Sequence, residues 1–142
     1  MLGEQHPDTA ITLNAIGQAL ASEGRYGEAM EYYERDLAIT VKVLGEHHPS
    51  TAITLNAIGQ ALHRQGRYGE ALEYYERDLA IMVKVLGEQH PDTAMSRFEL
   101  GRARRDTGDA AGRAQMEAAT QQLEDALGAD HPTVRVARSW LE

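Results

Sequence analysis

A tandem repeat constrains this chain more than any other feature of its sequence. Residues 2–43 and 44–85 align without a gap over 42 positions and differ at seven of them. A third unit begins at Leu86 with the same LGEQHPDTA that opens the first unit and diverges after Ala94, and LGADHPTV opens a fourth unit at Leu127. Repetition at such a period is typical of stacked arrays, in which each unit buries its apolar face against its neighbours. The seven differing pairs are Gln5/His47, Asp8/Ser50, Ala21/His63, Ser22/Arg64, Glu23/Gln65, Met30/Leu72 and Thr40/Met82.

The spacing of apolar residues inside each unit predicts two helices. Leu13, Ile16 and Leu20 follow helical spacing in the first half of the unit, and a similar stripe runs through the second half. Gly24 lies between the halves as a helix stop, and Pro7 occupies a helix start, where its missing N–H costs nothing. We therefore predict helices at residues 7–23, 26–44, 49–65, 68–86, 91–107, 110–127 and 131–141.

The string NAIGQALASEGRYGEAMEYYERDLAI, residues 14–39, resembles a tetratricopeptide repeat. Gly17, Gly24, Tyr26, Ala29 and Tyr33 match the family's signature spacing, and the LGEQHPDTA openings resemble the longer subclass of kinesin light chain and nephrocystin-like proteins. The resemblance implies an all-α fold, a right-handed superhelical solenoid of three tetratricopeptide helical hairpins plus a C-terminal capping helix. We expect one array over residues 1–142, with repeats at 2–43, 44–85 and, divergent, 86–126, and the capping helix at 127–142.

Composition narrows the range of partners. The chain has 14 Lys and Arg against 22 Asp and Glu and no cysteine. The acidic balance disfavours a nucleic-acid partner, and the lack of cysteine excludes disulfides and thiolate metal sites. No apolar run approaches the roughly 20 residues needed to span a bilayer, and the start lacks the regions of a signal peptide. We expect a cytoplasmic protein with no membrane partner.

The sequence offers no catalytic motif, so we expect neither an enzyme nor a cofactor. His6, His48, His90 and His131 recur in equivalent loops. Such loops are separated by at least one helix-packing distance, roughly 8–10 Å, whereas zinc needs nitrogens at about 2 Å. We therefore interpret these histidines as structural residues before the helix-starting prolines and predict no metal site.

The family resemblance implies that the first helix of each hairpin lines a concave groove, and hence a non-catalytic scaffold that holds a peptide or protein partner. Arg64, Arg102 and Arg105 would suit an acidic, phosphorylated or carboxylate-ended segment; the alternative is that they are solvated surface charges. Similar repeats in kinesin light chains have two adjacent asparagines where this chain has Asn14-Ala15 and Asn56-Ala57, so that binding mode is only half retained. The candidate groove residues are Asn14, Gln18, Ser22, Asn56, Gln60, His63, Arg64, Phe98, Arg102 and Arg105.

Two aspartates interrupt the apolar stripes of the second helices. Asp36 and Asp78 stand where the family pattern has a small alanine, and a buried carboxylate needs hydrogen-bond partners. The family's packing implies that Asp36 meets Thr54, and Asp78 meets Ser96, across the junctions between repeats.

A second hypothesis comes from the two ends of the array. Arg97, Arg104 and Trp140-Leu141 are consistent with a cap at the C-terminal end, whereas the first repeat nearly copies the second and has no cap-like features. Either the chain is the C-terminal piece of a longer array, or its N-terminal face pairs with another copy. Self-association into a homo-oligomer therefore competes with peptide capture.

Overall fold

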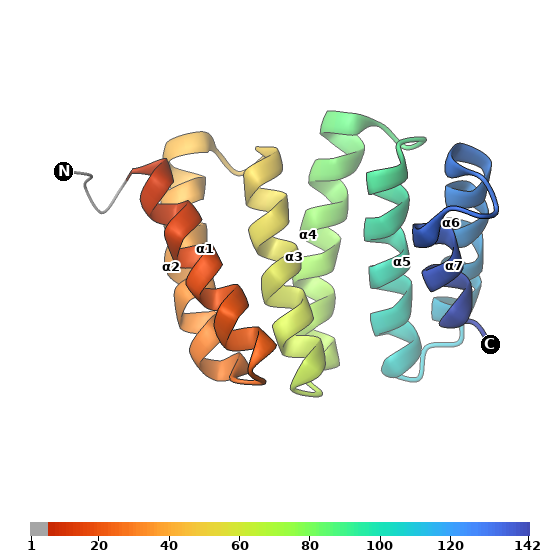
Figure 1. The fold of residues 1–142 in the computed structure, drawn as a ribbon, viewed down its shortest axis with the longest axis horizontal. Helices are drawn as coiled ribbons and strands as arrows, with labels where there is room; N and C mark the ends of the chain where they lie inside the picture. The colour runs from red at the N-terminus through yellow and green to blue at the C-terminus, as the bar shows by residue number, and fades with distance from the viewer. Residues whose placement is uncertain (1–5) are drawn as a thin grey trace.

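The computed structural model describes residues 6–142 and contains, within them, seven α-helices and no strand (Figure 1). Each predicted helix is present, with its ends within two residues of the predicted ones. Residues 2–5 of the expected first repeat lie outside the described residues. None of the described helices is long and apolar enough to cross a membrane. The helices are α1 (Pro7–Ser22), α2 (Tyr26–Leu44), α3 (Pro49–Arg64), α4 (Tyr68–Leu86), α5 (Pro91–Asp106), α6 (Ala111–Leu127) and α7 (Pro132–Ser139).

The loop histidines are helix caps. In α1, α3 and α5 a proline occupies the first turn, and the Nδ1 of the preceding histidine accepts the backbone N–H two residues later at 3.0 Å. His131 makes the same contact to the N–H of Thr133 at 3.2 Å. A helix start leaves backbone N–H groups without a partner, and this contact satisfies one of them. Among residues 6–142, no three His, Asp or Glu side chains gather as metal ligands.

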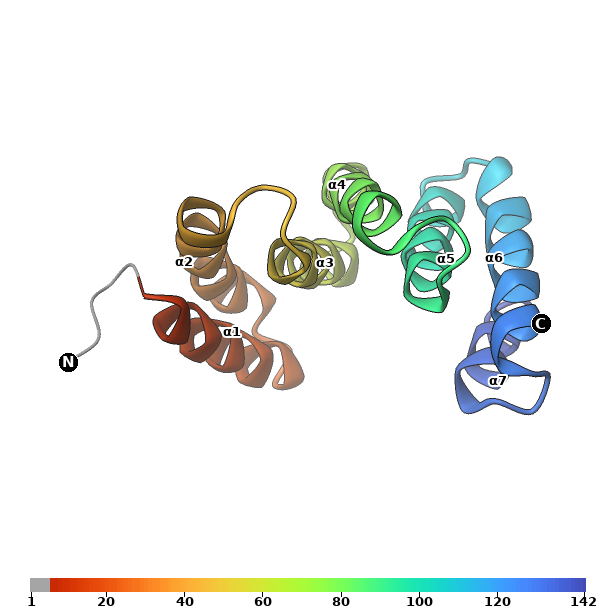
Figure 2. The same cartoon turned by 90° about the horizontal axis from the view of Figure 1, so that it is seen from above.

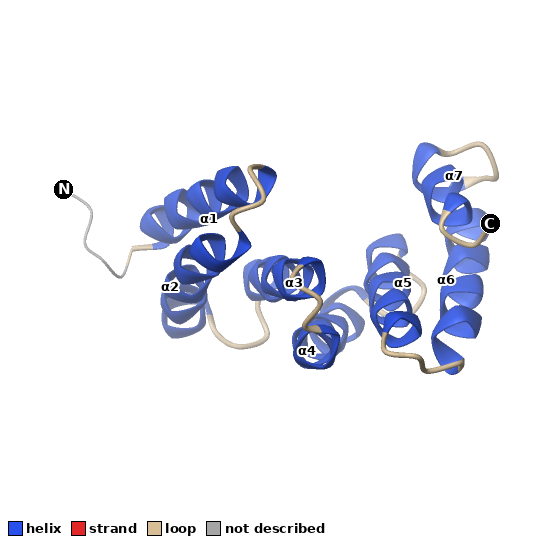
Figure 3. Ribbon diagram, turned by 90° about the horizontal axis from the view of Figure 1, so that it is seen from below, coloured by secondary structure: helices blue, strands red, loops and turns tan. Residues whose placement is uncertain are grey.

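The helices form two layers. Helices α1 and α2, α3 and α4, and α5 and α6 pair as hairpins, and the hairpins stack through contacts of α2 with α3 and of α4 with α5. Figures 2 and 3 show α1, α3, α5 and α7 in one layer and α2, α4 and α6 in the other. Because α1 and α7 stand forward at the two ends of the first layer, that layer forms the hollow side of an all-α solenoid.

In the first two hairpins a tyrosine ring packs against a glycine of the facing helix. Tyr33 and Tyr75 are 3% and 0% exposed. A Cβ added to Gly17 would lie 2.6 Å from Tyr33 Cε1, and one added to Gly59 would lie 2.8 Å from Tyr75 Cε1. Both distances are too short for carbon atoms, so only glycine lets the ring lie this close to the helix.

Two apolar clusters make up most of the core. The larger one joins all three hairpins through Tyr33, Ile58, Tyr75 and Leu100. The second joins the third hairpin to α7, where Val134 and Ala137 pack with Phe98, Met116 and Leu123. Helix α7 therefore covers the C-terminal end of the array.

We expect Gly59→Ala to destabilise the protein by about 1–3 kcal/mol, because the added methyl group must displace the buried Tyr75 ring. Gly69→Ala is the matched control, since a Cβ at Gly69 meets no atom within 4 Å. It should be neutral or stabilising by up to about 1 kcal/mol, because alanine is the better helix former. Urea unfolding measures both changes. Equal stability of the two variants would contradict the packing argument.

Candidate partner-binding groove

Four exposed or partly exposed aliphatic side chains repeat along the first-layer helices. Ile11, Ile53, Met95 and Val136 each follow the capping histidine of their own helix by five residues. Ile11 is 67% exposed, and Ile53 and Val136 are each 59% exposed, while Met95 is partly buried. We refer to these four residues as the aliphatic row.

Three cavities connect successive members of the aliphatic row. Ile11 and Ile53 line the first, of about 190 Å³, together with Val43 and Leu44. Ile53 and Met95 line the second, of about 430 Å³. Met95 and Val136 line the third, of about 360 Å³, together with Trp140. The row therefore runs along a continuous groove on α1, α3, α5 and α7.

The predicted asparagines and glutamines lie beside this row and form short ladders that point into the fold. Gln18 Nε2 donates to Asn14 Oδ1 at 3.1 Å, and Asn14 Nδ2 donates to Asp36 Oδ2 at 3.0 Å. Gln60 Nε2 donates to Asn56 Oδ1 at 2.7 Å, and Asn56 Nδ2 donates to Asp78 Oδ2 at 3.2 Å. The asparagine amides thus bind carboxylates within the fold, which leaves fewer of their donors for a partner.

The carboxylate at the first junction has the partner that the sequence predicted. Asp36 is 3% exposed, and Thr54 Oγ1 of the next hairpin donates to its Oδ2 at 2.7 Å. Thr40 Oγ1 donates to Oδ1 at 2.8 Å, so with Asn14 the carboxylate has three side-chain donors. Such a set satisfies a buried charged group.

Asp78 has a less favourable environment at the second junction. It is also 3% exposed, but Met82 stands where Thr40 serves Asp36, and a thioether cannot donate a hydrogen bond. Burial raises the pKa of Asp78 to about 6, while hydrogen bonds from Asn56 and Ser96 lower it and the Glu99 carboxylate raises it further. The Ser96 hydroxyl has one proton to share between the Asp78 carboxylate and Asp92 O, to which it donates at 3.3 Å, so the predicted Ser96 contact is weaker than the Thr54 contact of Asp36.

Glu99 is a groove residue that the sequence reasoning missed. Its carboxylate accepts a hydrogen bond from Asn56 and lines the second and third cavities. Burial raises the pKa of Glu99, and contacts with Asn56 and Arg102 oppose the rise. The signal was available, because Glu99 occupies the position of Ala15 and Ala57 in the repeat. A carboxylate that replaces alanine on the groove side of a helix indicates a candidate groove residue.

Phe98, predicted to be a groove contact, is largely buried, although it lines the third cavity. It is 3% exposed and belongs to the core cluster that includes Val134 and Ala137. The prediction carried over the groove position of Asn14 and Asn56 to the third repeat, but α7 packs over this part of α5 and buries the ring.

His63 also has little exposed surface. Its Nε2 lies 2.6 Å from Asp106 Oδ2, and burial, together with the charges of Arg102 and Arg64, lowers its pKa against the opposing effect of Asp106.

Two of the three predicted arginines contact Trp140. The Arg102 guanidinium lies 4.8 Å from the centre of the Trp140 ring, and Arg105 Nη1 donates to Trp140 O at 3.0 Å. Arg105 also pairs with Asp106. Arg64 is exposed and lines a separate cavity with Gln18, Ser22 and Gln60, and no hydrogen bond or ion pair engages its side chain within residues 6–142. Arg64 is therefore the exposed one of the three predicted arginines, whereas Arg102 and Arg105 are partly buried.

Comparison with known proteins agrees with this geometry. A family profile described as "Tetratricopeptide repeat" matches residues 8–82 and 62–112. The chain belongs to the tetratricopeptide repeat family. Members of this family generally mediate protein–protein interactions and are generally non-catalytic scaffolds. No curated protein sequence matches the chain.

Solved structures support the predicted subclass of tetratricopeptide protein. The array superposes with a TM-score of 0.84 on a putative kinesin light chain of Podosopora anserina with nearly identical TPR-like repeats, at 27% identity over 96% of this chain and 65% of that one. The superposition on BtubC (BKLC) of P. vanneervenii has a TM-score of 0.79 at 23% identity and covers 91% of this chain and 52% of that one. The N-terminal domain of stress-induced protein-1 of C. elegans gives 0.66 at 12% identity, over 96% and 97% of the two chains, and shows the fold alone. The prediction of a kinesin light chain-like tetratricopeptide array is confirmed.

The raised pKa of Asp78 predicts how the stability of this tetratricopeptide array depends on pH. Between about pH 4 and 6 the unfolded chain releases the Asp78 proton before the folded chain does, so the free energy of unfolding falls as pH rises. The rise in pKa from 3.8 to about 6 corresponds to about 3 kcal/mol in total. Asp78→Asn should remove this contribution, and Met82→Thr, which copies Thr40, should reduce it.

Urea unfolding at pH 4 and pH 7 measures the effect. For each variant, the free energy of unfolding minus that of the wild type should be larger at pH 7 than at pH 4. Asp125→Asn, which removes an exposed carboxylate on α6, controls for net charge. If the difference between Asp78→Asn and the wild type is the same at both pH values, Asp78 does not titrate as described.

Proposed function

We propose that this tetratricopeptide array is a non-catalytic scaffold that holds an extended segment of a protein partner along the aliphatic row. The proposal rests on one observation, the repetition of an aliphatic side chain at the same position of four helices, exposed on α1, α3 and α7 and partly exposed on α5. Contiguous exposed apolar surface of this kind is typical of interaction sites. The three cavities beside the row would receive successive side chains of the segment.

Charge adds a preference to this proposal. Arg64 is the groove arginine without a protein partner among the described residues, and a guanidinium binds carboxylate or phosphate oxygens well. Arg102 and Arg105 already contact Trp140. An acidic or phosphorylated residue of the partner would therefore bind near α1 and α3 rather than near α7.

Selection of binding peptides from a random display library tests the groove. Ile53→Glu should lower the affinity for selected peptides at least tenfold, because it places a charge in the middle of the aliphatic row. Ile53 is already exposed, so the fold should be retained. Val85→Glu is the matched control, since Val85 is a 43% exposed aliphatic residue at the end of α4, outside the row. Peptides that bind the wild type and both variants equally would contradict groove binding.

A second candidate function is self-association through the outer face of α1. Ile16 is 39% exposed, whereas its twin Ile58, in the same local sequence of α3, is 0% exposed because α2 and the first hairpin cover it. The equivalent pair Ala19 and Ala61 differs in the same direction. The α1 face thus has the composition of a packed interface.

If α1 pairs with a second copy, light scattering across a concentration series should show a rise in mass. Ile16→Glu should then abolish the rise, and Val85→Glu should leave it unchanged. A constant monomer mass over the whole series would contradict self-association without bearing on peptide capture.

A further inference from the structure

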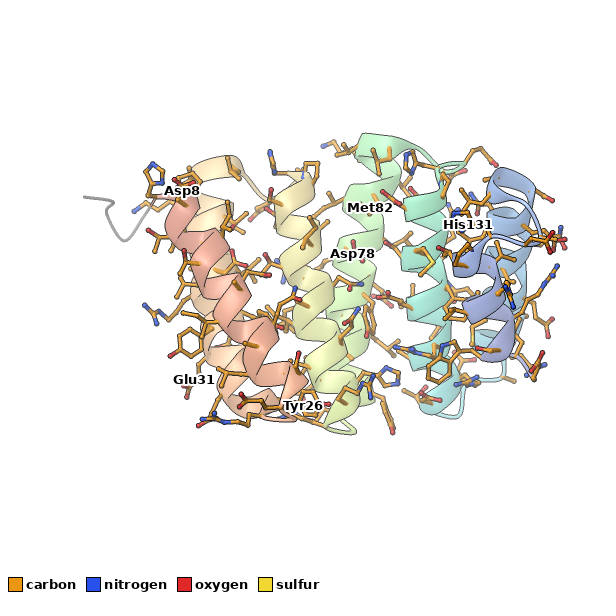
Figure 4. All side chains as sticks on the ribbon, viewed as in Figure 1. Asp8, Tyr26, Glu31, Asp78, Met82 and His131 are labelled. Atoms are coloured by element: carbon orange, nitrogen blue, oxygen red, sulfur yellow. The ribbon has the colours of Figure 1, made fainter. Side chains whose placement is uncertain are left out.

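The junction between the first two hairpins contains a cavity of about 420 Å³ that opens on the groove side. Tyr33 and Tyr26 line it from α2, Ala21 lines it from α1 and Arg64 lines it from α3. Figure 4 labels Tyr26 at the end of the first hairpin, near the ends of α1 and α3. The volume lies in the range of small-ligand sites. We refer to it as the Tyr33 cavity; its other lining residues are Gln18, Ser22, Ala57, Gln60 and Ala61.

The equivalent space at the second junction is occupied by a side chain of the protein itself. His63 stands where the first junction has Ala21. Its imidazole packs edge-on against Tyr68, with ring centroids 5.1 Å apart, and against Tyr75 at 6.5 Å. Its Nε2 lies 2.6 Å from Asp106 Oδ2. The second junction therefore provides an internal example of what fits between these two tyrosines, namely a flat ring with a polar group at its outer end.

The two junctions differ in the charge that the outer end of the ring would meet. Tyr68, Tyr75 and Asp106 follow Tyr26, Tyr33 and Arg64 by 42 residues each. Asp106 is an acceptor and suits the ring nitrogen of His63, whereas Arg64 is a cation and suits an anion. Burial raises the pKa of Tyr33, so its hydroxyl remains a hydrogen-bond donor at neutral pH. A ring that enters the Tyr33 cavity should therefore have an anionic group at the end facing Arg64.

We propose that the Tyr33 cavity binds a phosphotyrosine side chain, with the ring between Tyr26 and Tyr33 and the phosphate at Arg64. The residue would come from the partner segment, so this inference rests on the proposed groove function. The Tyr33 cavity shares Gln18, Ala57 and Gln60 with the central cavity of the groove, and a bound segment can therefore reach both. The chemistry recognised is that of an aryl phosphate.

The test follows amide chemical shifts of the whole chain by NMR while phenyl phosphate is added. The shifts should concentrate at Ala21, Tyr26 and Arg64, and inorganic phosphate should bind at least tenfold more weakly. Equal affinity for inorganic phosphate would overturn the proposal, since the ring would then contribute nothing. The peptide acetyl-Gly-Gly-phosphotyrosine-Gly-Gly-amide should bind at least as tightly as phenyl phosphate. Exclusion of this peptide would overturn the assignment to a protein side chain and leave a free aryl phosphate as the ligand.

A double variant fills the Tyr33 cavity with the side chains found at the second junction. Ala21→His with Arg64→Asp copies the pair His63 and Asp106 into the first junction and should lower phenyl phosphate affinity at least tenfold. Arg64→Gln changes only an exposed side chain, so the fold should be retained. Its affinity for phenyl phosphate should also be at least tenfold lower than that of the wild type. Arg35→Gln removes an exposed arginine of α2 that does not line the cavity and should have no effect. Unchanged affinity of Arg64→Gln would overturn the proposal.

The two proposals can fail separately. If displayed peptides depend on Ile53 but phenyl phosphate binds Arg64→Gln as well as it binds the wild type, the groove function stands and the phosphotyrosine site is wrong. If no peptide depends on Ile53 while phenyl phosphate still requires Arg64, the site stands and the groove function is wrong.

Discussion

The packing of a tyrosine ring against a glycine fixes the geometry of the first two hairpins. Tyr33 on Gly17 and Tyr75 on Gly59 set how closely the two helices approach, since no larger residue than glycine fits beneath the ring. The same tyrosines then line the two junctions between hairpins. The third hairpin has no such tyrosine and closes by direct helix contact, where a Cβ on Gly101 would lie 2.9 Å from the backbone oxygen of Gly112.

Hydrogen-bonded carboxylates hold the stacked hairpins in register. A buried carboxylate is costly unless donors surround it, and at the first junction Asp36 receives donors from both hairpins. The asparagines that supply part of this network are the residues expected to contact a partner. Their structural use shifts the open binding surface to the aliphatic row and Arg64. Single substitutions, such as Met82 for Thr40 and Glu99 for alanine, make the second junction electrostatically different from the first.

The C-terminal helix changes the character of the groove. Arg64, Arg102 and Arg105 suggested an acidic ligand, but Trp140 contacts two of them, Arg102 and Arg105. Near that end the groove therefore presents Met95, Val136 and Trp140 together with Glu99 and Arg102. Of the three predicted arginines, the exposed one is Arg64, nearer the middle of the array.

The sequence by itself determined the helices, their starts and the stacking, because these follow from local spacing and from a repeat that places equivalent residues in equivalent neighbourhoods. The Asp36–Thr54 contact was implied by the resemblance to the tetratricopeptide family. It could not determine which side chains remain open. Ile16 and Ile58 lie in identical local sequence but differ in burial, and Phe98 and Arg102 are covered by a helix more than 30 residues further along the chain. Exposure depends on which distant segments pack against a residue, and periodicity within one repeat does not contain that information. Only the tertiary structure therefore decided that α7 covers part of the groove and that His63 fills one junction while Ala21 leaves the other open.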